Sequence, residues 1–443
     1  MQLSRKGLFV ALLALALAGL VVAAPVEITY MQWYNTTQSE GQQVQERIDQ
    51  FNASQDKIKV TLIIIPRDGY ETKVNTMAAA GQLPDTTMLS EAMAVEFAAN
   101  GLLADVSTMY PKGAGPLKSL TFTYNGTPVA YSSGNVFLGL YFNKKLFDEA
   151  KLPYPPTTAD KAWTWQQFID VAKKLTKDKN GKTANQSGFD SKNIVQYGAD
   201  FNRLWWMWPI VTYSNGGGLI SADGKQLLIG KSESIEAMQK LADLYVKEKV
   251  APSVADKAAM PSLDLTLLTG KVAMATSGHW EMGVSLNNSL KDGLSYGFGV
   301  LPKMKTAVTY NTGGPFAIFN STKHLPESME FMRWWSDDKA QWSAITGGIM
   351  MPANAKWYKD EATMREWADM PPRPPFAEFK GMIDYAMNNA IGVPWYYFNG
   401  YQGLTDILES GIDAVWNGKT TAKAYINSIM PKLQKYFEEH KAK

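Results

Sequence analysis

The chain has 443 residues, more than one ordinary hydrophobic core accommodates, which predicts two or three domains. Hydrophobic residues make up 45% of it and charged residues 19%, values typical of a folded globular protein and not of a disordered one. The 44 basic and 42 acidic residues nearly balance, so no strong electrostatic surface for nucleic acid is expected.

Residues 1–24 have the layout of a secretory signal peptide. Arg5 and Lys6 precede an apolar run from Leu8 to about Val22, and small residues follow. The alternative is an uncleaved membrane anchor, for which the run is slightly short. We expect cleavage near Ala23 and a mature protein that is soluble outside the cytoplasm, periplasmic or otherwise extracytoplasmic. Without this segment, 42 basic residues remain against 42 acidic ones.

The next part of the chain alternates between strand-like and helix-like patterns. The predicted strands are 26–35, 57–66 and 84–90, and the predicted helices are 39–54 and 69–82. The continuous apolar run at 62–65 is typical of a buried parallel strand. This β-α-β-α-β order predicts a parallel sheet with helices on its faces. Ligands of such sheets bind beyond the carboxyl ends of the strands, here 32–35, 66–68 and 90–91.

The middle of the chain mixes strands with amphipathic helices. The predicted elements are a strand running into a helix at 136–152, a helix within 155–178, a helix at 232–249, a helix end and strand at 267–280, and a strand at 294–302. The C-terminal third is predicted to be mostly helical, with a proline-broken stretch at 370–379. The sequence contains no internal repeat and no low-complexity segment, so we predict an α/β protein that is not a repeat array.

The residue inventory excludes several kinds of catalytic and metal chemistry. Cysteine is absent, which excludes disulfides, thiol catalysis, thiolate metal sites and a lipid anchor on an N-terminal cysteine. The three histidines are His279, His324 and His440, and we expect the first two to be structural or at the surface. No phosphate-binding loop or dinucleotide-type glycine motif occurs. We therefore expect no cofactor and nominate no metal ligand, which leaves carboxylate chemistry as the possible enzymology.

The segment RLWWMWPI, residues 203–210, crowds three tryptophans beside Pro209. Such rings serve as core, as a membrane interface, as a base-stacking platform or as a platform for a sugar, and the balanced charge disfavours bases. In a helix, Trp205 and Trp208 share a face and Trp206 turns about 100° away. If Pro209 instead opens a helix, the leading tryptophans lie in the loop before it. In both cases the three rings cannot bury on one face, and we expect Trp208 to be mostly core.

Several short motifs follow one another along almost the whole chain. They are ITYMQW (28–33), KIKVTLIII (57–65), AAAGQLPDTTML (78–89), NGLLADVS (100–107), LGLYFNKKLFDEAKL (138–152), TWQQFIDVAKKLT (164–176), LTGKVAMATSGHW (268–280) and YGFGVLP (296–302). In their order and spacing the chain resembles the extracellular solute-binding proteins of ABC importers, in the sugar-binding family that includes maltose-binding protein. One departure is Phe142, which separates Tyr141 from Asn143 where the family has Tyr-Asn-Lys.

The resemblance implies a two-lobed periplasmic-binding-protein fold, in which each lobe is a β-sheet flanked by helices and hinge strands join the lobes. The expected lobes are 25–136 with 302–346, and 137–301 with 347–443, and the expected crossings are near 134–140, 300–303 and 347–352. A ligand closes such lobes by contacting both of them better in the closed form. The closed form would then dock on membrane-embedded permease subunits, and we expect a monomer.

The candidate ligand-binding residues combine flat rings with hydrogen-bonding groups. Sugars offer C–H faces to aromatic rings, and their buried hydroxyls need partners. The candidates are Trp33, Asn35, Glu91, Arg203, Trp205, Trp280, Gly313, Gly314, Trp395 and Tyr396. In the family, the segment like 203–210 lines the cleft from the second lobe, and Trp205 falls on a stacking aromatic.

Structural alternatives remain open for most of these candidates. Trp280 follows a strand of small residues whose Gly278 permits close backbone approach. Glu91 either accepts hydrogen bonds from sugar hydroxyls or is a solvated loop acid, and the same alternatives apply to Asn35 and Arg203. The glycine pair 313–314 allows a ligand to approach the backbone, but a plain turn explains it equally well.

The predicted function is that of the extracytoplasmic component of an ABC importer, which binds a di- or oligosaccharide and is not an enzyme. One alternative is a secreted glycoside hydrolase, which needs two carboxylates at a defined separation. The spacing of the acidic residues nominates no such pair. Another alternative is a binder of the same fold for a phosphorylated polyol or a peptide.

Overall fold

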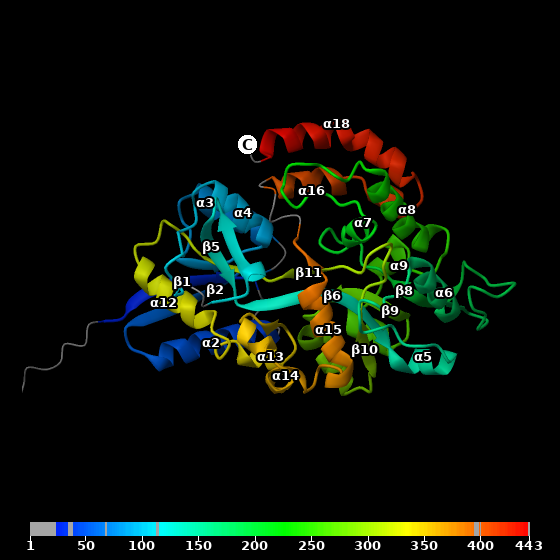
Figure 1. Cartoon of the computed structure of the whole chain (residues 1–443), viewed down its shortest axis with the longest axis horizontal. Coiled ribbons are helices and arrows are strands. Elements are labelled where there is room, and N and C mark those ends of the chain that lie inside the picture. The colour runs from blue at the N-terminus through cyan, green and yellow to red at the C-terminus, as the bar shows by residue number, and fades with distance from the viewer. Residues whose placement is uncertain are drawn as a thin grey trace, which may run out of the picture.

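The computed structural model describes residues 24–33, 39–66, 69–111, 115–393, 398 and 400–441. Within these ranges the strands form two sheets, each flanked by helices, which gives the two-lobed α/β architecture expected from the sequence (Figure 1). The predicted signal peptide lies outside the described residues, apart from its last residue. Among the helices that are described, none is long and apolar enough to span a membrane.

The first lobe surrounds a six-stranded sheet with the strand order β2-β1-β3-β12-β5-β4 among the described residues. Its strands are β1 (Val26–Gln32), β2 (Ile58–Ile64), β3 (Thr86–Met88), β4 (Thr121–Tyr124), β5 (Thr127–Ser132) and β12 (Pro315–Ile318). Its helices are α2 (Ser39–Ser54), α3 (Tyr70–Ala79), α4 (Glu91–Ala99), the 3₁₀ helix η1 (Lys118–Leu120) and α12 (Leu325–Trp335). β1 runs parallel to β2 and β3, so the predicted β-α-β-α-β alternation is confirmed.

The burial predicted for β2 is wrong. The four residues at 62–65 are partly exposed and not buried. The reason lies in the strand order, because β2 is the edge strand of the sheet and pairs only with β1. Helices cover an edge strand less completely than a central one, so a continuous apolar run does not by itself identify a central strand.

The second lobe surrounds the other sheet, in which the ten-residue strand β6 pairs with β9, β10, β11 and β13. Its strands are β6 (Gly134–Asn143), β7 (Lys177–Asp178), β8 (Ile194–Asp200), β9 (Val272–Gly278), β10 (Tyr296–Gly299), β11 (Thr309–Thr312), β13 (Met351–Pro352) and β14 (Ala390–Ile391). Its earlier helices are α5 (Lys144–Ala150), α6 (Trp165–Leu175), α7 (Ile210–Ser214), α8 (Ser232–Val246), α9 (Val254–Ala258), α10 (Leu263–Leu268), the π-helix η2 (Met282–Leu286) and α11 (Asn287–Leu290).

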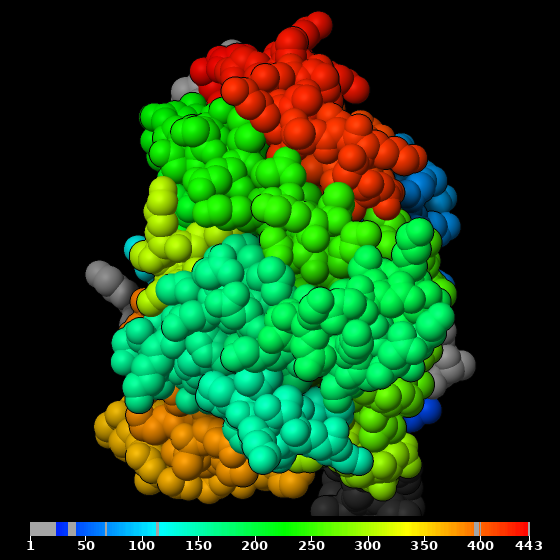
Figure 2. Space-filling view, turned by 90° about the vertical axis from the view of Figure 1, so that its right-hand side faces the viewer, coloured from blue at the N-terminus to red at the C-terminus, as the bar shows by residue number. Residues whose placement is uncertain are grey.

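The C-terminal third is mostly helical, as predicted. Its helices after α12 are α13 (Trp342–Thr346), the 3₁₀ helix η3 (Ala355–Tyr358), α14 (Glu361–Ala368), α15 (Phe376–Asn388), α16 (Tyr401–Glu409), α17 (Asp413–Trp416) and α18 (Ala422–His440). In Figure 1, α16 and α18 lie along the top of the second lobe and reach toward α3 and α4 of the first. Figure 2 shows the outer face of the second lobe, with the C-terminal helices above it and the segment around α15 below.

Three segments of the chain connect the two sheets. The first leads from β5 to β6 through Ser133, the second leads from β11 to β12 through Gly313 and Gly314, and the third leads from α13 to β13 through residues 347–350. The second crossing was expected near 300–303. It comes later because β11 pairs with β6 and β14 of the second sheet. We propose that the lobes divide at these three crossings.

The glycines of the second crossing are explained by close packing. A Cβ atom added to Gly313 would lie 2.1 Å from Ser132 Oγ and 2.2 Å from the carbonyl oxygen of Gly134. A Cβ atom on Gly314 would lie 2.0 Å from Met88 Cε. The first and second crossings therefore approach each other so closely that there is no room for a side chain at Gly313.

The core of the second lobe contains the tryptophan of the RLWWMWPI segment that was expected to be core. Trp208 is 0% exposed, its Nε1 donates a hydrogen bond to Glu409 Oε1 at 2.9 Å, and its ring meets that of Trp416 at 5.9 Å. Burial raises the pKa of the Glu409 carboxyl to about 7, although the hydrogen bond from Trp208 opposes that shift. The core prediction for Trp208 is confirmed.

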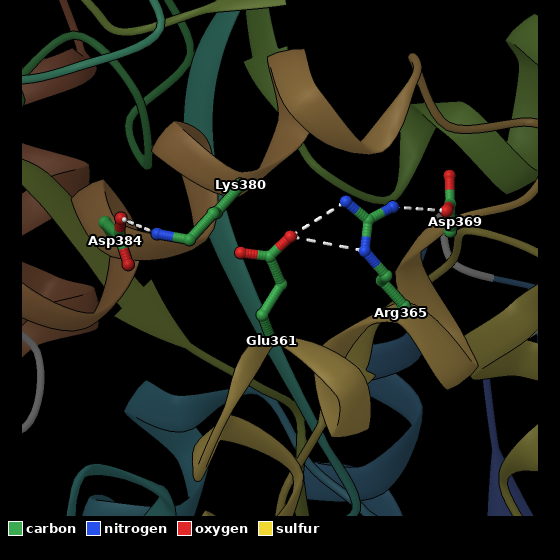
Figure 3. Close-up of polar contacts among 5 residues, drawn as sticks. All are labelled: Glu361, Arg365, Asp369, Lys380 and Asp384. Atoms are coloured by element: carbon green, nitrogen blue, oxygen red, sulfur yellow. Dashed lines mark hydrogen bonds and ion pairs between the residues drawn. The ribbon is translucent and has the colours of Figure 1, made fainter.

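Exposed ion pairs lie on the helices that follow the third crossing. Arg365 of α14 contacts Glu361 at 2.8 Å and Asp369 at 2.6 Å, and Lys380 contacts Asp384 at 3.1 Å on α15 (Figure 3). Each pair joins residues four positions apart on or next to one helix. Exposed pairs of this kind contribute only a few tenths of a kcal/mol, about 0.3–0.5, so they do not decide the fold.

Gly313→Ala should destabilise the protein by about 1–3 kcal/mol, because the added methyl group must displace Ser132 or the Gly134 backbone. Urea unfolding of the purified protein measures this change. Gly411→Ala is the control, since its Cβ atom would lie 3.2 Å from the nearest atom, a carbon of the Tyr425 side chain. Equal stability of the two variants would contradict the packing explanation.

Glu409→Gln should be more stable than the wild-type protein at pH 8, by about 1–3 kcal/mol, and the difference should shrink toward pH 5. Burial raises the pKa of Glu409 from its ordinary 4.5 to about 7. Its contribution to stability is therefore complete below about pH 4.5 and is lost as the pH rises through about 7. Glutamine cannot ionise, yet its amide oxygen still accepts the indole hydrogen bond of Trp208.

Urea unfolding at several pH values between 5 and 8 checks this prediction. Glu149→Gln, on the exposed side of α5, is the matched control and should show little change. A stability difference for Glu409→Gln that does not vary with pH would refute the prediction.

Candidate functional site

Two parallel strands bring the predicted aromatic residues of the second lobe together. β8 runs parallel to β9, so their carboxyl ends, Asp200 and Gly278, lie at the same edge of the sheet. The tryptophan segment follows β8, and Trp280 follows β9. The rings of Trp206 and Trp280 are 5.3 Å apart at an interplanar angle of 61°, an edge-to-face contact.

The remaining tryptophan of the segment also lies in this group. Trp205 is 6.1 Å from the ring of Tyr401, at the start of α16. Trp205, Trp206 and Trp280 are all partly exposed, in contrast to Trp208. Pro209 directly precedes α7, so the tryptophans lie in the turn that enters the helix, the second of the two predicted geometries. We call Trp205, Trp206, Trp280 and Tyr401 the aromatic edge.

Gly278 and Glu281 hold Trp280 in place. A Cβ atom on Gly278 would lie 2.0 Å from Cζ3 of Trp280, so the glycine lets the indole ring fold back over the end of β9. Glu281 accepts hydrogen bonds from Ser277 Oγ at 3.1 Å and from Ser285 Oγ at 2.6 Å. Burial raises the pKa of Glu281, and these hydrogen bonds oppose the shift together with one that involves the Trp280 side chain. The residues around Trp280 therefore fix its orientation.

The first lobe contributes Glu91 and Trp33 at the carboxyl edge of its sheet. Glu91 is the first residue of α4, and its Oε1 accepts a hydrogen bond from the hydroxyl of Thr312, the residue before the Gly313–Gly314 crossing. Trp33 follows β1 and meets the ring of Tyr70 edge-on at 5.4 Å. The Tyr70 hydroxyl in turn donates to the carbonyl oxygen of Met88 at 2.7 Å. Both candidates are thus tied to neighbouring elements of the fold.

The two lobes approach each other beside the aromatic edge. Ala92, the second residue of α4, packs in the same apolar cluster as Phe398, Tyr401 and Leu404 of the second lobe. Trp205 and Trp280 pack against this cluster. The start of α4, which carries Glu91, therefore lies against the part of the second lobe that holds the tryptophans.

Arg203 lies at the carboxyl end of β8 but packs against its own lobe. Its guanidinium lies 4.2 Å from the ring centre of Tyr245, and the Tyr245 hydroxyl donates to the carbonyl oxygen of Phe201. Among the described residues, the buried Nη1 of Arg203 has no hydrogen-bond partner. This cation–π contact fixes the arginine near the aromatic edge.

Other predicted residues are either outside the described ranges or structural. Asn35, Trp395 and Tyr396 lie outside the described residues. His279 is fully buried between the rings of Phe137 at 5.4 Å and Phe379 at 5.7 Å, as expected of a structural histidine. Burial lowers its pKa well below the ordinary value, which keeps it neutral at neutral pH. In the described part of the chain no three His, Asp or Glu side chains gather as a metal site would require.

Three residues of the site were not predicted from the sequence. Thr312 contacts Glu91 across 221 positions of the chain, and such long-range pairs leave no local signal. Tyr401 is the first residue of α16, and its sequence context does not distinguish it from other aromatic residues in helices. Trp206 was recognised in its segment but was not chosen, because its neighbour Trp205 fitted the family pattern.

Comparison with known proteins identifies the family. Residues 34–342, well over half of the chain, match the family model of the bacterial extracellular solute-binding proteins. The sn-glycerol-3-phosphate-binding periplasmic protein UgpB of Brucella melitensis is 24% identical over 419 residues, which cover 90% of each chain.

Solved structures share the two-lobed fold over nearly the whole chain. The ABC substrate-binding protein Lmo0181 from Listeria monocytogenes, in complex with cycloalternan, superposes with a TM-score of 0.78 at 21% identity and covers 93% of this chain and 98% of its own. An ABC transporter solute-binding protein from Thermotoga lettingae bound with α-D-tagatose has a TM-score of 0.76 at 18% identity, with 93% and 100% covered. With its two sheets and three crossings, this chain belongs to the bacterial extracellular solute-binding protein family.

Proposed function

We propose that the protein is the extracytoplasmic component of an ABC importer and binds a di- or oligosaccharide between its lobes. The observation that carries this proposal is the aromatic edge. Three partly exposed tryptophans gather at the carboxyl edge of the second sheet, while the start of α4 approaches them from the first lobe. A ligand held between these surfaces touches both lobes, which is the condition for closure by a ligand.

The chemistry of the two surfaces suits a carbohydrate. The rings of Trp205 and Trp280 offer flat apolar area to the C–H faces of sugar rings. The carboxylate of Glu91 accepts hydrogen bonds, as sugar hydroxyls require when they are buried. The solved relatives that bind cycloalternan and tagatose support a carbohydrate ligand.

A phosphorylated polyol is the second candidate ligand, because the UgpB relative binds sn-glycerol 3-phosphate. A phosphate group needs a positively charged partner. Arg203 is the described cation beside the aromatic edge, but it stacks on Tyr245 within its own lobe. This placement favours an uncharged sugar over a phosphorylated polyol.

We propose no enzymatic activity for the site. The carboxylates described near it are engaged with other groups: Glu91 accepts from Thr312, Glu281 accepts from two serines, and Asp200 pairs with Lys257 at 2.7 Å. A glycoside hydrolase needs one carboxyl free to protonate the leaving group and a second to act as base or nucleophile. The contacts of Glu91 and Glu281 support binding without bond cleavage.

The proposal includes export and transfer to a membrane partner. The N-terminal pattern supports cleavage near Ala23, and the absence of cysteine argues against a lipid anchor. The protein would act as a monomer that delivers its ligand to permease subunits.

Trp280→Ala and Trp205→Ala should each weaken sugar binding by about 30- to 150-fold, which corresponds to about 2–3 kcal/mol, with the fold intact. Trp208→Ala should instead cost about 3–5 kcal/mol of stability, because Trp208 is a core side chain. Titration calorimetry over a panel of mono- and oligosaccharides, combined with urea unfolding, separates the two effects.

Trp334→Ala on α12 is the matched control, since this partly exposed tryptophan packs against Phe51 in the first lobe. It should leave sugar affinity unchanged. If Trp280→Ala and Trp205→Ala bind sugar normally but unfold early, the aromatic edge is core and the proposed site is wrong. Conversion of the sugar during the titration would indicate an enzyme.

Ligand should also change the shape of the protein. Two lobes joined by three crossings should close on a bound sugar, and small-angle scattering should report a smaller radius of gyration at saturation. Glycerol 3-phosphate serves as the comparison ligand. A radius that stays constant with a sugar shown to bind would argue for a rigid site.

A further inference from the structure

A small polar pocket lies where the first lobe meets two of the crossings. It has a volume of about 30 Å³, and its polar lining consists of Gln32, Gln43, Arg47, Ser133 and Gln341. Gln32 is the last residue of β1, at the carboxyl edge of the first sheet, and Ser133 is the first crossing. The pocket therefore lies at the carboxyl edge of the first sheet, beside the first crossing, and none of its lining residues belongs to the aromatic edge.

Two carbonyl oxygens in the lining lack hydrogen-bond partners within the described part of the chain. Gln341 is 1% exposed, and its Nε2 donates to the carbonyl oxygen of Trp335 at 2.5 Å, but its buried Oε1 has no partner there. The buried Oε1 of Gln43 has none either. An unsatisfied buried acceptor costs roughly 1–3 kcal/mol, so these oxygens favour a ligand that donates hydrogen bonds.

The charges around the pocket narrow the chemistry of that ligand. Arg47 is 6% exposed and lies 4.9 Å from the ring centre of Trp335, and among the described residues no acidic side chain lines the pocket. The arginine repels an ammonium group or a metal ion, while the two carbonyl oxygens repel a carboxylate or phosphate. A hydroxyl group both donates and accepts a hydrogen bond, so it suits this lining.

The size and the walls of the pocket favour a short hydroxyl-bearing group. A volume of 30 Å³ has room for roughly two water-sized groups. Met88, Trp335 and Met350 supply apolar walls beside the polar groups. A hydroxymethyl group consists of one carbon and one oxygen, which matches both the size and the mixed lining.

We propose that this pocket is a hydroxyl-binding subsite that takes a hydroxymethyl arm of the bound carbohydrate, and that water supplies the hydroxyl groups when no sugar is bound. The binding of a hydroxymethyl arm, called the sugar part below, rests on the proposed sugar-binding function. The preference of the pocket for hydroxyl groups does not. The sugar part predicts a preference for hexose units over pentose units, because a pentopyranose lacks the hydroxymethyl arm.

Calorimetry with cellobiose and xylobiose tests the sugar part. The two disaccharides share a linkage and differ in their hydroxymethyl arms. The wild-type protein should bind cellobiose more tightly, and Gln341→Met should weaken cellobiose binding about fivefold while leaving xylobiose unchanged. Gln434→Met, on the exposed side of α18, is the control and should change neither affinity. An equal effect of Gln341→Met on both sugars, or none on either, would overturn the sugar part.

A high-resolution crystal structure of the sugar-free protein tests the hydroxyl chemistry independently of any sugar. Oxygen atoms about 2.7–3.0 Å from Gln341 Oε1 and Gln43 Oε1 are expected. An anion or metal ion in the pocket, or protein donors on both oxygens, would overturn the subsite. If neither disaccharide binds, the sugar part is overturned for this linkage, while the wider sugar panel decides the proposed function and this structure alone decides the hydroxyl chemistry. Waters retained in a sugar-bound crystal would assign the pocket to water and overturn the sugar part.

Discussion

The close packing of the three crossings is the constraint on which the rest of the structure depends. A Cβ atom at Gly134 would lie 2.1 Å from Met350 Sδ, and one at Gly313 would lie 2.1 Å from Ser132 Oγ. The backbone next to the first crossing thus packs against the Met350 side chain of the third crossing, and the backbone of Gly313 packs against Ser132 and Gly134 beside the first. Interiors packed this tightly move as units and do not deform continuously. A relative motion of the lobes would therefore require dihedral changes at a few crossing residues, as at other hinges.

A buried arginine anchors the third crossing to the second lobe. Arg373 is 6% exposed and donates hydrogen bonds to the carbonyl oxygens of Met350 at 3.0 Å and Trp367 at 2.9 Å. Burial lowers its pKa to about 10, so it keeps its charge at neutral pH. A buried charge needs hydrogen-bond partners, and backbone carbonyls supply them to both terminal nitrogens of this guanidinium, Nη1 and Nη2. Arg373 consequently holds the third crossing against the second lobe. On the first-lobe side of the crossing, Met350 lines the polar pocket.

Local sequence patterns predicted where the helices and strands lie. They did not predict which distant elements pair with one another. The helix expected at 39–54 has those bounds, and the parallel order of the first three strands follows from alternation alone. The second crossing was misplaced because β11 joins the second sheet through pairing with β6, and the Thr309 hydroxyl donates to the carbonyl oxygen of Leu138, 171 positions away. No local pattern encodes such a partner.

In the candidate site, too, the local segments were predicted and their distant partners were not. The tryptophan segment was recognisable, and the expectation that its rings would separate was correct because Pro209 directly precedes α7. The partner that holds Trp208 in the core is Glu409, 201 positions further along the chain, and that distance hides it from sequence patterns. Gly278 was expected to permit a close approach to the backbone, and in the structure the approaching group is the indole of its near neighbour Trp280.

The contact between α4 and α16 links the two lobes through apolar side chains. The small side chain of Ala92 lets the first lobe reach the apolar cluster around Tyr401 and Leu404 without any ligand. Apolar area buried in such a contact contributes about 25 cal/mol per Å² of stabilisation. A ligand shifts an equilibrium only by the difference in its contacts with the two states. The two lobes share this apolar contact in the structure, and the hydrogen bond from Thr312 holds the Glu91 carboxylate of α4 beside the second crossing.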